Sequence, residues 1–262
     1  MGSATTQART ATTAALDAAT GVDLAVAGEL FQAVRLLGSS SALAGALANP
    51  AAAPAARSRV VSDVFGAALS PVSVTLLDAA TAVRWSSVDD FVDGVEELAI
   101  RAASKATDTD LEGELFAFAQ TVAANPELEL ALGRRFGDNA AKGALVTSLL
   151  SGRASEAATL VVSSLAQQPR ERRIRQALTW AMNLVASQRG RVVASVTSAT
   201  AISDAQAERL RDALARRYGT EVSLNTVIDP SIVGGLRVQI ADDVIDASIS
   251  AKLADLRQRL AG

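Results

Sequence analysis

The chain repeats itself at a spacing of 85 residues, and this repeat limits its possible folds more than any other feature. The tetrapeptide Gly-Glu-Leu-Phe begins at Gly28 and again at Gly113. At the same spacing Leu43 falls on Leu128, and near the end of the copy a shift of one residue restores the match. Four identical residues alone could be accidental, but an apolar pattern held in register over four helices favours a duplicated structural unit.

Each copy has the pattern of a run of amphipathic helices. In the first copy Leu24, Leu30, Val34 and Leu37 lie near one face of a predicted helix. Prolines then interrupt the chain, and Ser87 caps a long helix that runs towards Lys105. Because the chain is 49% hydrophobic but only 3% aromatic, the core is expected to consist mainly of Ala, Leu and Val.

The pattern changes after Gly190 to β-branched, alternating segments separated by a helix that begins near Ser203. The order there is strand, helix, strand, strand, helix. We therefore predict a mainly α fold with two tandem helical bundles, residues 1–107 and 108–190. A small α+β domain with a β-hairpin and a terminal helix follows in residues 191–262.

Composition excludes several kinds of active site. The chain has no Cys and no His, so thiolate nucleophiles, His-based triads and zinc–sulfur sites are ruled out. Its 25 basic and 28 acidic residues give a net charge of −3, which offers no reason to expect nucleic-acid binding. We therefore expect no catalytic residue, cofactor or metal. No apolar run is long enough to span a bilayer, so we expect no membrane insertion and an intracellular, soluble protein.

Glycines and acids in the last domain have structural interpretations. Gly234-Gly235 leads into a strand and lacks the Lys of a phosphate-binding loop, so a hairpin or bulge with positive φ is expected. Four acids could suggest a metal, but no calcium-loop pattern is present, and turn positions are favoured for Asp229, Asp242 and Asp243. These acids are Asp229, Asp242, Asp243 and Asp246.

A basic cluster and two tryptophans allow two interpretations each. The arginines are a solvated helix start or a binding patch, and the tryptophans are core residues or the lining of a groove for a partner helix. The residues are Arg170, Arg172, Arg173, Arg175, Trp85 and Trp180.

The last domain resembles the C-terminal part of the delta subunit of F-type ATP synthases, the bacterial counterpart of the oligomycin-sensitivity-conferring protein. The residues that fit the family signature are Val222, Leu224, Ile228, Asp229, Ile232, Gly234, Gly235, Leu236, Val238, Gln239 and Asp246. The closing segment "LADLRQRL" fits the family's last helix. The chain departs from the family at Ala241 and Ala247, where Gly is usual, and at Ala11, where a Tyr is usual. Two helical bundles instead of one resemble the enlarged delta regions of actinobacterial enzymes.

The resemblance implies a non-catalytic stator subunit that joins alpha-subunit N-terminal helices on the catalytic head to b-type peripheral stalk subunits. It also implies a peripheral place on the cytoplasmic face of the plasma membrane. Candidate partner-binding residues are Leu16, Leu210, Leu214, Leu253 and Leu256. We expect one bundle to hold alpha, with the other as a spacer or stalk contact, rather than both holding alpha.

Two alternatives remain open. One is a helical adaptor of another multisubunit assembly. The other is an enzyme that uses carboxylates or a lysine such as Lys142 or Lys252, which would need a concave pocket with strongly perturbed titratable groups.

Overall fold

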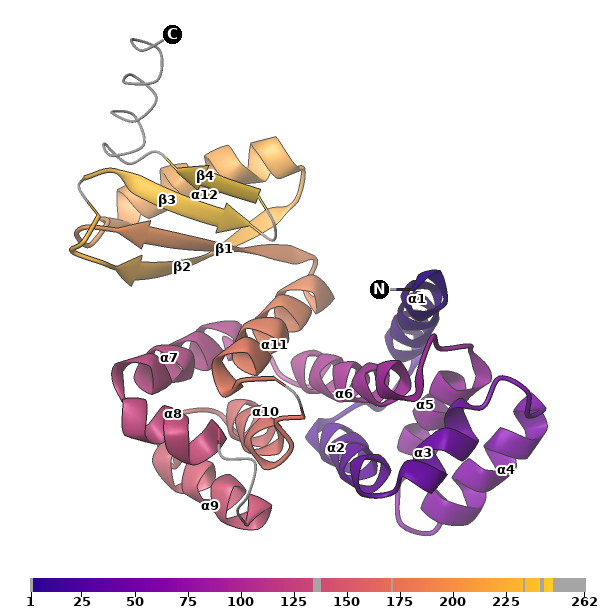
Figure 1. The fold of residues 1–262 in the computed structure, drawn as a ribbon. Helices are drawn as coiled ribbons and strands as arrows, with labels where there is room; N and C mark the ends of the chain where they lie inside the picture. Colours follow the sequence, from indigo (N-terminus) through magenta and orange to yellow (C-terminus); the bar gives the residue numbers. More distant parts are fainter. Residues whose placement is uncertain (1, 134–137, 171, 233, 241–242, 247–262) are drawn as a thin grey trace, which may run out of the picture. The chain divides into compact units, whose positions relative to one another are not determined.

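A computed structural model describes residues 2–133, 138–170, 172–232, 234–240 and 243–246 (Figure 1). The chain divides into two compact units, Met1–Val185 and Ala186–Gly262. The first is helical, and the second contains a four-stranded sheet. The predicted mainly α fold with a small α+β part is confirmed, while the proposed boundary between residues 107 and 108 stays a prediction.

The helices of the helical unit repeat in register. The first copy contains α1 (Ser3–Ala18), α2 (Leu24–Ser39), α3 (Ser41–Ala48), α4 (Pro54–Phe65), α5 (Pro71–Ala82) and α6 (Val88–Lys105). The second contains α7 (Leu111–Ala124), α8 (Pro126–Gly133), α9 (Asn139–Leu150), α10 (Glu156–Gln167) and α11 (Ile174–Gln188). Both ends of α8, α9 and α10 lie 85 residues after those of α3, α4 and α5, which supports the duplication inferred from the apolar pattern.

A hydrogen-bond pair is repeated at the same spacing. Glu29 of α2 accepts bonds from the backbone N–H of Ser70, at 2.9 Å, and from its hydroxyl, at 2.7 Å. Glu114 of α7 binds Ser155 through the same two groups. Both serines are the N-caps of the helices that follow them, α5 and α10. Each copy therefore fixes the start of one helix, α5 or α10, by a carboxylate from its Gly-Glu-Leu-Phe helix, α2 or α7.

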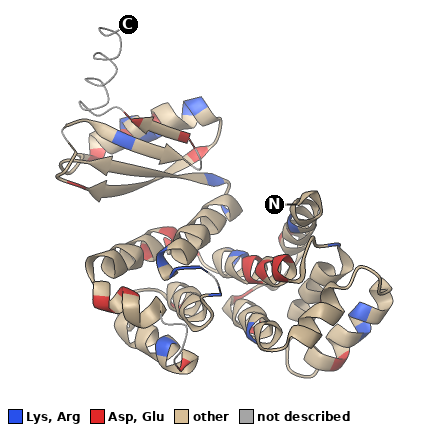
Figure 2. Cartoon of the chain, viewed as in Figure 1, with Lys and Arg blue, Asp and Glu red and all other residues tan. Residues whose placement is uncertain are grey.

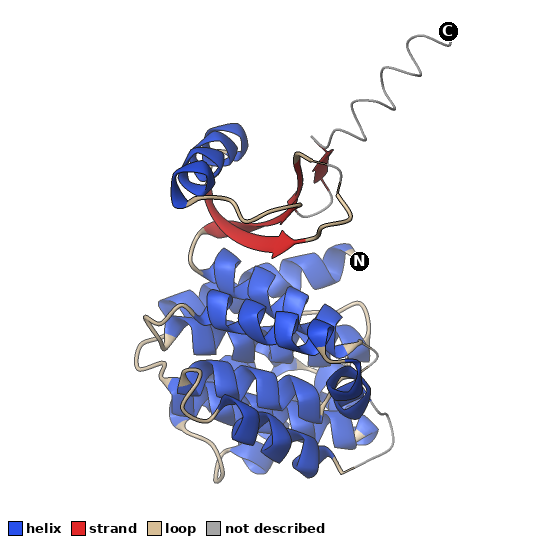
Figure 3. Cartoon of the chain, turned by 90° about the vertical axis from the view of Figure 1, so that its left-hand side faces the viewer, coloured by secondary structure: helices blue, strands red, loops and turns tan. Residues whose placement is uncertain are grey.

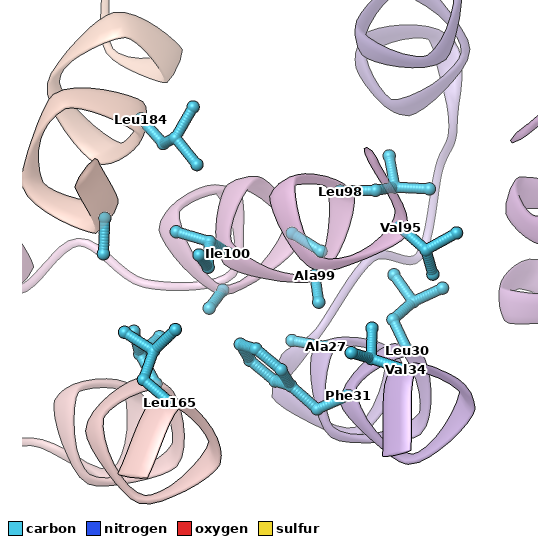
Figure 4. Close-up of a cluster of buried hydrophobic side chains, with 14 of the residues drawn as sticks. Ala27, Leu30, Phe31, Val34, Val95, Leu98, Ala99, Ile100, Leu165 and Leu184 are labelled. Carbon is cyan, nitrogen blue, oxygen red and sulfur yellow. The ribbon is translucent and has the colours of Figure 1, made fainter. Parts of the chain in front are cut away.

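Helix α6 belongs to both copies. A shift of 85 residues carries α1 onto residues 88–103, which lie within α6, so α6 ends the first copy and takes the place of α1 in the second. It is buried almost all round, as expected of a helix with neighbours on both sides. Figure 4 shows Val95 and Ala99 of α6 facing α2, with Leu165 of α10 close by. One hydrophobic cluster runs through both copies.

Local end signals account for the limits of α6 and α5. The Ser87 hydroxyl accepts a bond from the N–H of Asp90 at 3.0 Å, which confirms the predicted cap. Pro71 occupies the first turn of α5. At the other end of α6, Lys105 donates to three carbonyls around the C-terminus of α1, at 2.7 to 2.9 Å.

No single helix in the described part is long and apolar enough to cross a membrane; α2 and α3, bent by 108°, pass that test only as a pair.

The second unit has a mixed sheet in the order β2-β1-β3-β4. Its elements are β1 (Arg191–Ser198), α12 (Asp204–Tyr218), β2 (Glu221–Ile228), β3 (Leu236–Ile240) and β4 (Asp243–Asp246). β1 runs parallel to β2 in the register Arg191 to Glu221, and α12 connects them along one face of the sheet (Figure 3). A capping box of Ser203 and Gln206 begins α12, and Gly219 in the left-handed region ends it, as predicted.

The hairpin lies one connection later than the glycine pair suggested. β3 pairs with β1 and not with β2. Gly234-Gly235 therefore lies in the connection from β2 to β3, two strands that are not neighbours in the sheet, and this connection is not a hairpin turn. The run predicted as one strand after Gly235 contains two strands, β3 and β4, which pair in antiparallel fashion. The positive φ expected of the glycines is confirmed, at 65° and 86°. The predicted terminal helix lies outside the described residues.

Candidate functional site

The signature residues on the strands build the small sheet. Val222 and Val238 are buried, and Leu224 and Leu236 pack against the same apolar cluster. Ile228, at the end of β2, is 55% exposed. Most of this part of the signature is therefore committed to the domain's own core.

The other signature residues shape the connection to β3 and the last strand. Asp229 accepts a bond from the N–H of Ser231 at 2.9 Å, and hydrogen bonds from Ser231 lower the pKa of its carboxyl. The Asp229 carbonyl binds the N–H of Ile232 at 3.2 Å. Asp246 pairs with Arg237 of β3 at 2.9 Å. The predicted turn role of Asp229 is confirmed.

The candidate partner-binding leucines lie on inner faces where the structure describes them. Leu16 is fully buried in the helical unit, and Leu214 is buried between α12 and the sheet. Leu210 is half-buried against the same cluster. Leu253 and Leu256 lie outside the described residues. A partner that bound these leucines would have to displace packing inside the chain. Their role in binding stays a prediction.

The outward face of α12 is charged. Leu210 and Leu214 point to the sheet, so the residues between them face solvent. Exposed charged residues on this face are Asp204, Glu208, Arg209, Arg211, Asp212, Arg216 and Arg217. A partner on this side of the second unit would meet both signs of charge.

The acids considered as metal ligands have local partners. Asp243 accepts a bond from the Tyr218 hydroxyl at 2.6 Å, and this bond raises the pKa of Tyr218. In the described part of the chain, no group of three His, Cys, Asp or Glu residues is placed to hold a metal ion. Asp242 and Lys252 lie outside the described residues. Lys142 is buried and lines a cavity of about 740 Å³ between the two helical copies.

Two of the four clustered arginines bind the acidic N-terminal half of α6. Arg170 Nε lies 2.9 Å from Asp93, and Arg172 Nη2 lies 3.0 Å from the same carboxylate. Arg172 also pairs with Glu96, which is almost fully buried. Figure 2 shows the acidic residues gathered on α6 and the basic segment before α11. Sequence reasoning missed these pairs; the only available signal was the opposite charge of the two segments.

Burial and charge act in opposite directions on Glu96. Burial raises the pKa of its carboxyl, while Arg172 and Arg170 lower it, and the net direction is upward. The arginines from the second copy therefore offset part of the effect of burial on the Glu96 carboxyl.

The tryptophans have different environments. Trp85 is buried, its Nε1 donates to the carbonyl of Ala80 at 2.8 Å, and its ring meets Phe91 edge-on at 6.1 Å. Trp180 is half-buried, and the Arg172 guanidinium lies over its ring at 4.2 Å. Of the two, Trp180 is the one that lines surface cavities, as a groove residue would.

Comparisons of the sequence point to one family. A family model described as ATP synthase delta (OSCP) subunit matches residues 97–260, beginning within α6. The ATP synthase subunit delta of Leifsonia xyli subsp. xyli is 46% identical, with 100% of both chains covered. That of Streptomyces avermitilis is 40% identical over 94% of this chain and 93% of the relative.

A solved structure is also similar. A chain in the cryo-EM structure of the Toxoplasma gondii mitochondrial ATP synthase hexamer is 15% identical, with 64% of this chain and 96% of that chain covered and a TM-score of 0.40.

Proposed function

The chain belongs to the ATP synthase delta (OSCP) subunit family, and we propose that it is a non-catalytic stator subunit of a proton-translocating F-type ATP synthase. In this role it joins the top of the catalytic head to the peripheral stalk and resists the torque of the rotor. The observation that carries the proposal is the match to a delta subunit over the full length of both chains.

The proposed partners are the N-terminal helices of alpha subunits and the ends of b-type stalk subunits. An alpha helix would lie in a groove of the helical unit, where small side chains allow a close approach of the backbones. The b subunits would bind the second unit, on its charged helix and its strand edges. Long-lived joints usually bury more than about 1,200 Å² in total, so several such contacts are expected to act together.

The two helical copies are proposed to divide the work. One holds an alpha helix, and the other serves as a spacer or as a further stalk contact. Their surfaces differ in a way that supports this division, because the acids of α6 are engaged by the second copy, while Arg175 of α11 and Arg173 just before it are exposed. As part of the ATP synthase the chain would lie peripherally, on the cytoplasmic face of the plasma membrane.

Calorimetry with the full-length chain tests the proposal. One titration uses the cognate alpha N-terminal peptide, and the other uses the soluble domain of the b subunit. We expect saturable binding in both titrations. Absence of binding to the peptide, to the intact catalytic head and to the b domain would contradict the stator role and favour an adaptor of another assembly.

A further inference from the structure

Helix α4 begins without the carboxylate that begins its counterpart in the second copy. Both ends of α9 lie 85 residues after those of α4, so Ala53 and Asp138 hold the same position before their helices. The Asp138 side chain caps α9 by accepting a bond from the N–H of Ala140 at 2.8 Å. Ala53 offers no side-chain bond, and within the described ranges the N–H of Ala55, the counterpart of Ala140, has no acceptor. The start of α4 therefore keeps a free backbone donor at the positive end of the helix.

A buried arginine lies in the first turns of the same helix. Arg57 is only 6% exposed, and in the part of the chain that the structure describes its guanidinium has no ion pair or hydrogen bond. Asp78 of α5, the helix packed on α4, also has a buried oxygen without a partner, and the two side chains do not form an ion pair. Buried charged groups are normally paired, so a cation in this position calls for an anion.

Arg57 and the N–H of Ala55 serve the same place. Side chains of a helix lean towards its N-terminus, and positions four residues apart share a face. Arg57 follows Ala53 by four residues, so its stem runs back towards the place that a longer side chain at position 53 would take. A carboxylate held there, as that of Asp138 is held in α9, would meet the N–H of Ala55, the positive helix end and the guanidinium. The second copy combines the same groups, because buried Lys142 stands at the position of Arg57.

We propose that the start of α4 is a carboxylate-binding site, in which an acidic side chain of a partner protein binds the N–H of Ala55 and the guanidinium of Arg57. The residues from Ala53 to Ala56 are exposed, so a partner can reach this place. A small carboxylate would be held by these few groups alone, whereas a protein that carries one adds the contacts of its own surface. The site goes beyond the proposed stator role, and its ability to bind a carboxylate does not depend on that role.

The first test titrates the full-length chain with sodium acetate, and with sodium chloride at equal ionic strength, while NMR follows the backbone amides. The amide of Ala55 should shift saturably with acetate, and that of Ala140, already bound to Asp138, should not. R57M keeps the apolar stem and should weaken the response at least fivefold. A53D should abolish it and raise the melting temperature, because the new carboxylate takes the site. No saturable shift of the Ala55 amide, or an equal shift in R57M, would overturn the inference.

The second test identifies the source of the carboxylate. Calorimetry measures the binding of the purified catalytic head and of the purified soluble b domain to the unaltered chain, to A53D and to A67D. The control A67D makes the same change at another exposed alanine of the first copy. A53D should bind one of the two partners at least fivefold more weakly, while A67D should stay within twofold for both.

The outcomes separate this inference from the stator role. If A53D bound both partners as tightly as the unaltered chain does, the protein source of the carboxylate would be overturned, and the stator role would stand. If the unaltered chain bound neither partner, the stator role and the protein source would both fail, while a saturable acetate response would still establish the site.

Discussion

The pair formed by Glu96 and Arg172 places a carboxylate and a guanidinium from different copies in the interior of the helical unit. Replacing Arg172 by Met should leave the buried carboxylate without its main partner and lower the free energy of unfolding by about 3 kcal/mol or more at pH 7. The pKa of Glu96 is raised in the folded state, so its negative charge lowers the free energy of unfolding. This loss is complete above the folded-state pKa and absent below the unfolded-state pKa. The deficit of R172M should therefore shrink as the pH falls.

Urea denaturation of R172M, E96Q and the double variant at several pH values measures this effect. The double variant should recover much of the stability lost in R172M, because no buried charge remains. A double variant as unstable as R172M would show that lost packing on Trp180, and not the charge of Glu96, is the cause.

Glu29 and Glu114 give a matched pair of predictions, one in each copy. Burial alone would raise the pKa of Glu29, but hydrogen bonds from Ser73 and Ser70 outweigh it and lower the pKa. A lowered pKa contributes stability that is present above the unfolded-state value and is lost as the pH falls through the folded-state pKa. E29Q and E114Q should each cost about 1–2 kcal/mol near pH 7 in thermal or urea unfolding. The loss from E29Q should be smaller under acid conditions. A similar loss from both would agree with the repeated cap; no loss from either would contradict it.

Helix α6 contains a glycine whose replacement should have an unusual sign. Ala in place of Gly usually stabilises a helix interior by up to about 1 kcal/mol. At Gly94, however, an added Cβ would collide with the ring of Trp85. G94A should therefore destabilise by about 1–3 kcal/mol and alter the tryptophan fluorescence. At Gly45 of α3 nothing described lies within 4 Å of the added Cβ, so the control G45A should be neutral or stabilising. A stabilised G94A would refute the close packing of Trp85.

Helix ends could be predicted from the sequence because their causes are local. Ser87, Pro71, Ser203 and Gly219 act within one turn of their own helices, and each was found where its signal placed it. The strand order could not be predicted in the same way. Whether β3 joins β2 or β1 depends on contacts between residues distant in the chain, and the glycine turn before β3 is compatible with both.

The candidate site shows the same limit. The signature residues identified the fold of the second unit, but the apolar side chains that attracted attention as anchors, Leu16 and Leu214, are buried. A sequence pattern reveals that a helix has an apolar face but not whether that face meets its own domain or a partner. Arg170 and Arg172 bind α6, whereas Arg173 and Arg175 are exposed. This difference depends on how α6 approaches the arginines, which only the structure shows.

The sharing of α6 makes the two helical copies mechanically one body. Phe31 of α2 is buried beside α6 and Leu165 of α10, so a residue of the first copy supports the second (Figure 4). In the proposed stator role such a joint would be useful, because force entering one copy would pass through a continuous core and not through a flexible linker. The same arrangement implies that a fragment beginning at residue 108 would lack one helix of its own bundle.

The consequence can be measured in the full-length chain by native-state hydrogen exchange. F31A should cost about 3–5 kcal/mol and reduce protection in α10 and α11 as well as in α2, because the three helices contribute to one core. Amides of β1 and β2 should keep their protection, since they belong to the other compact unit. V196A is the reciprocal control: Val196 is fully buried in the sheet unit, so its truncation should loosen β1 and β2 and spare the helices. If F31A left α10 as protected as before, the two copies would be independent bundles, and load transfer between them would have to occur through the ion pairs of Arg170 and Arg172 with α6 alone.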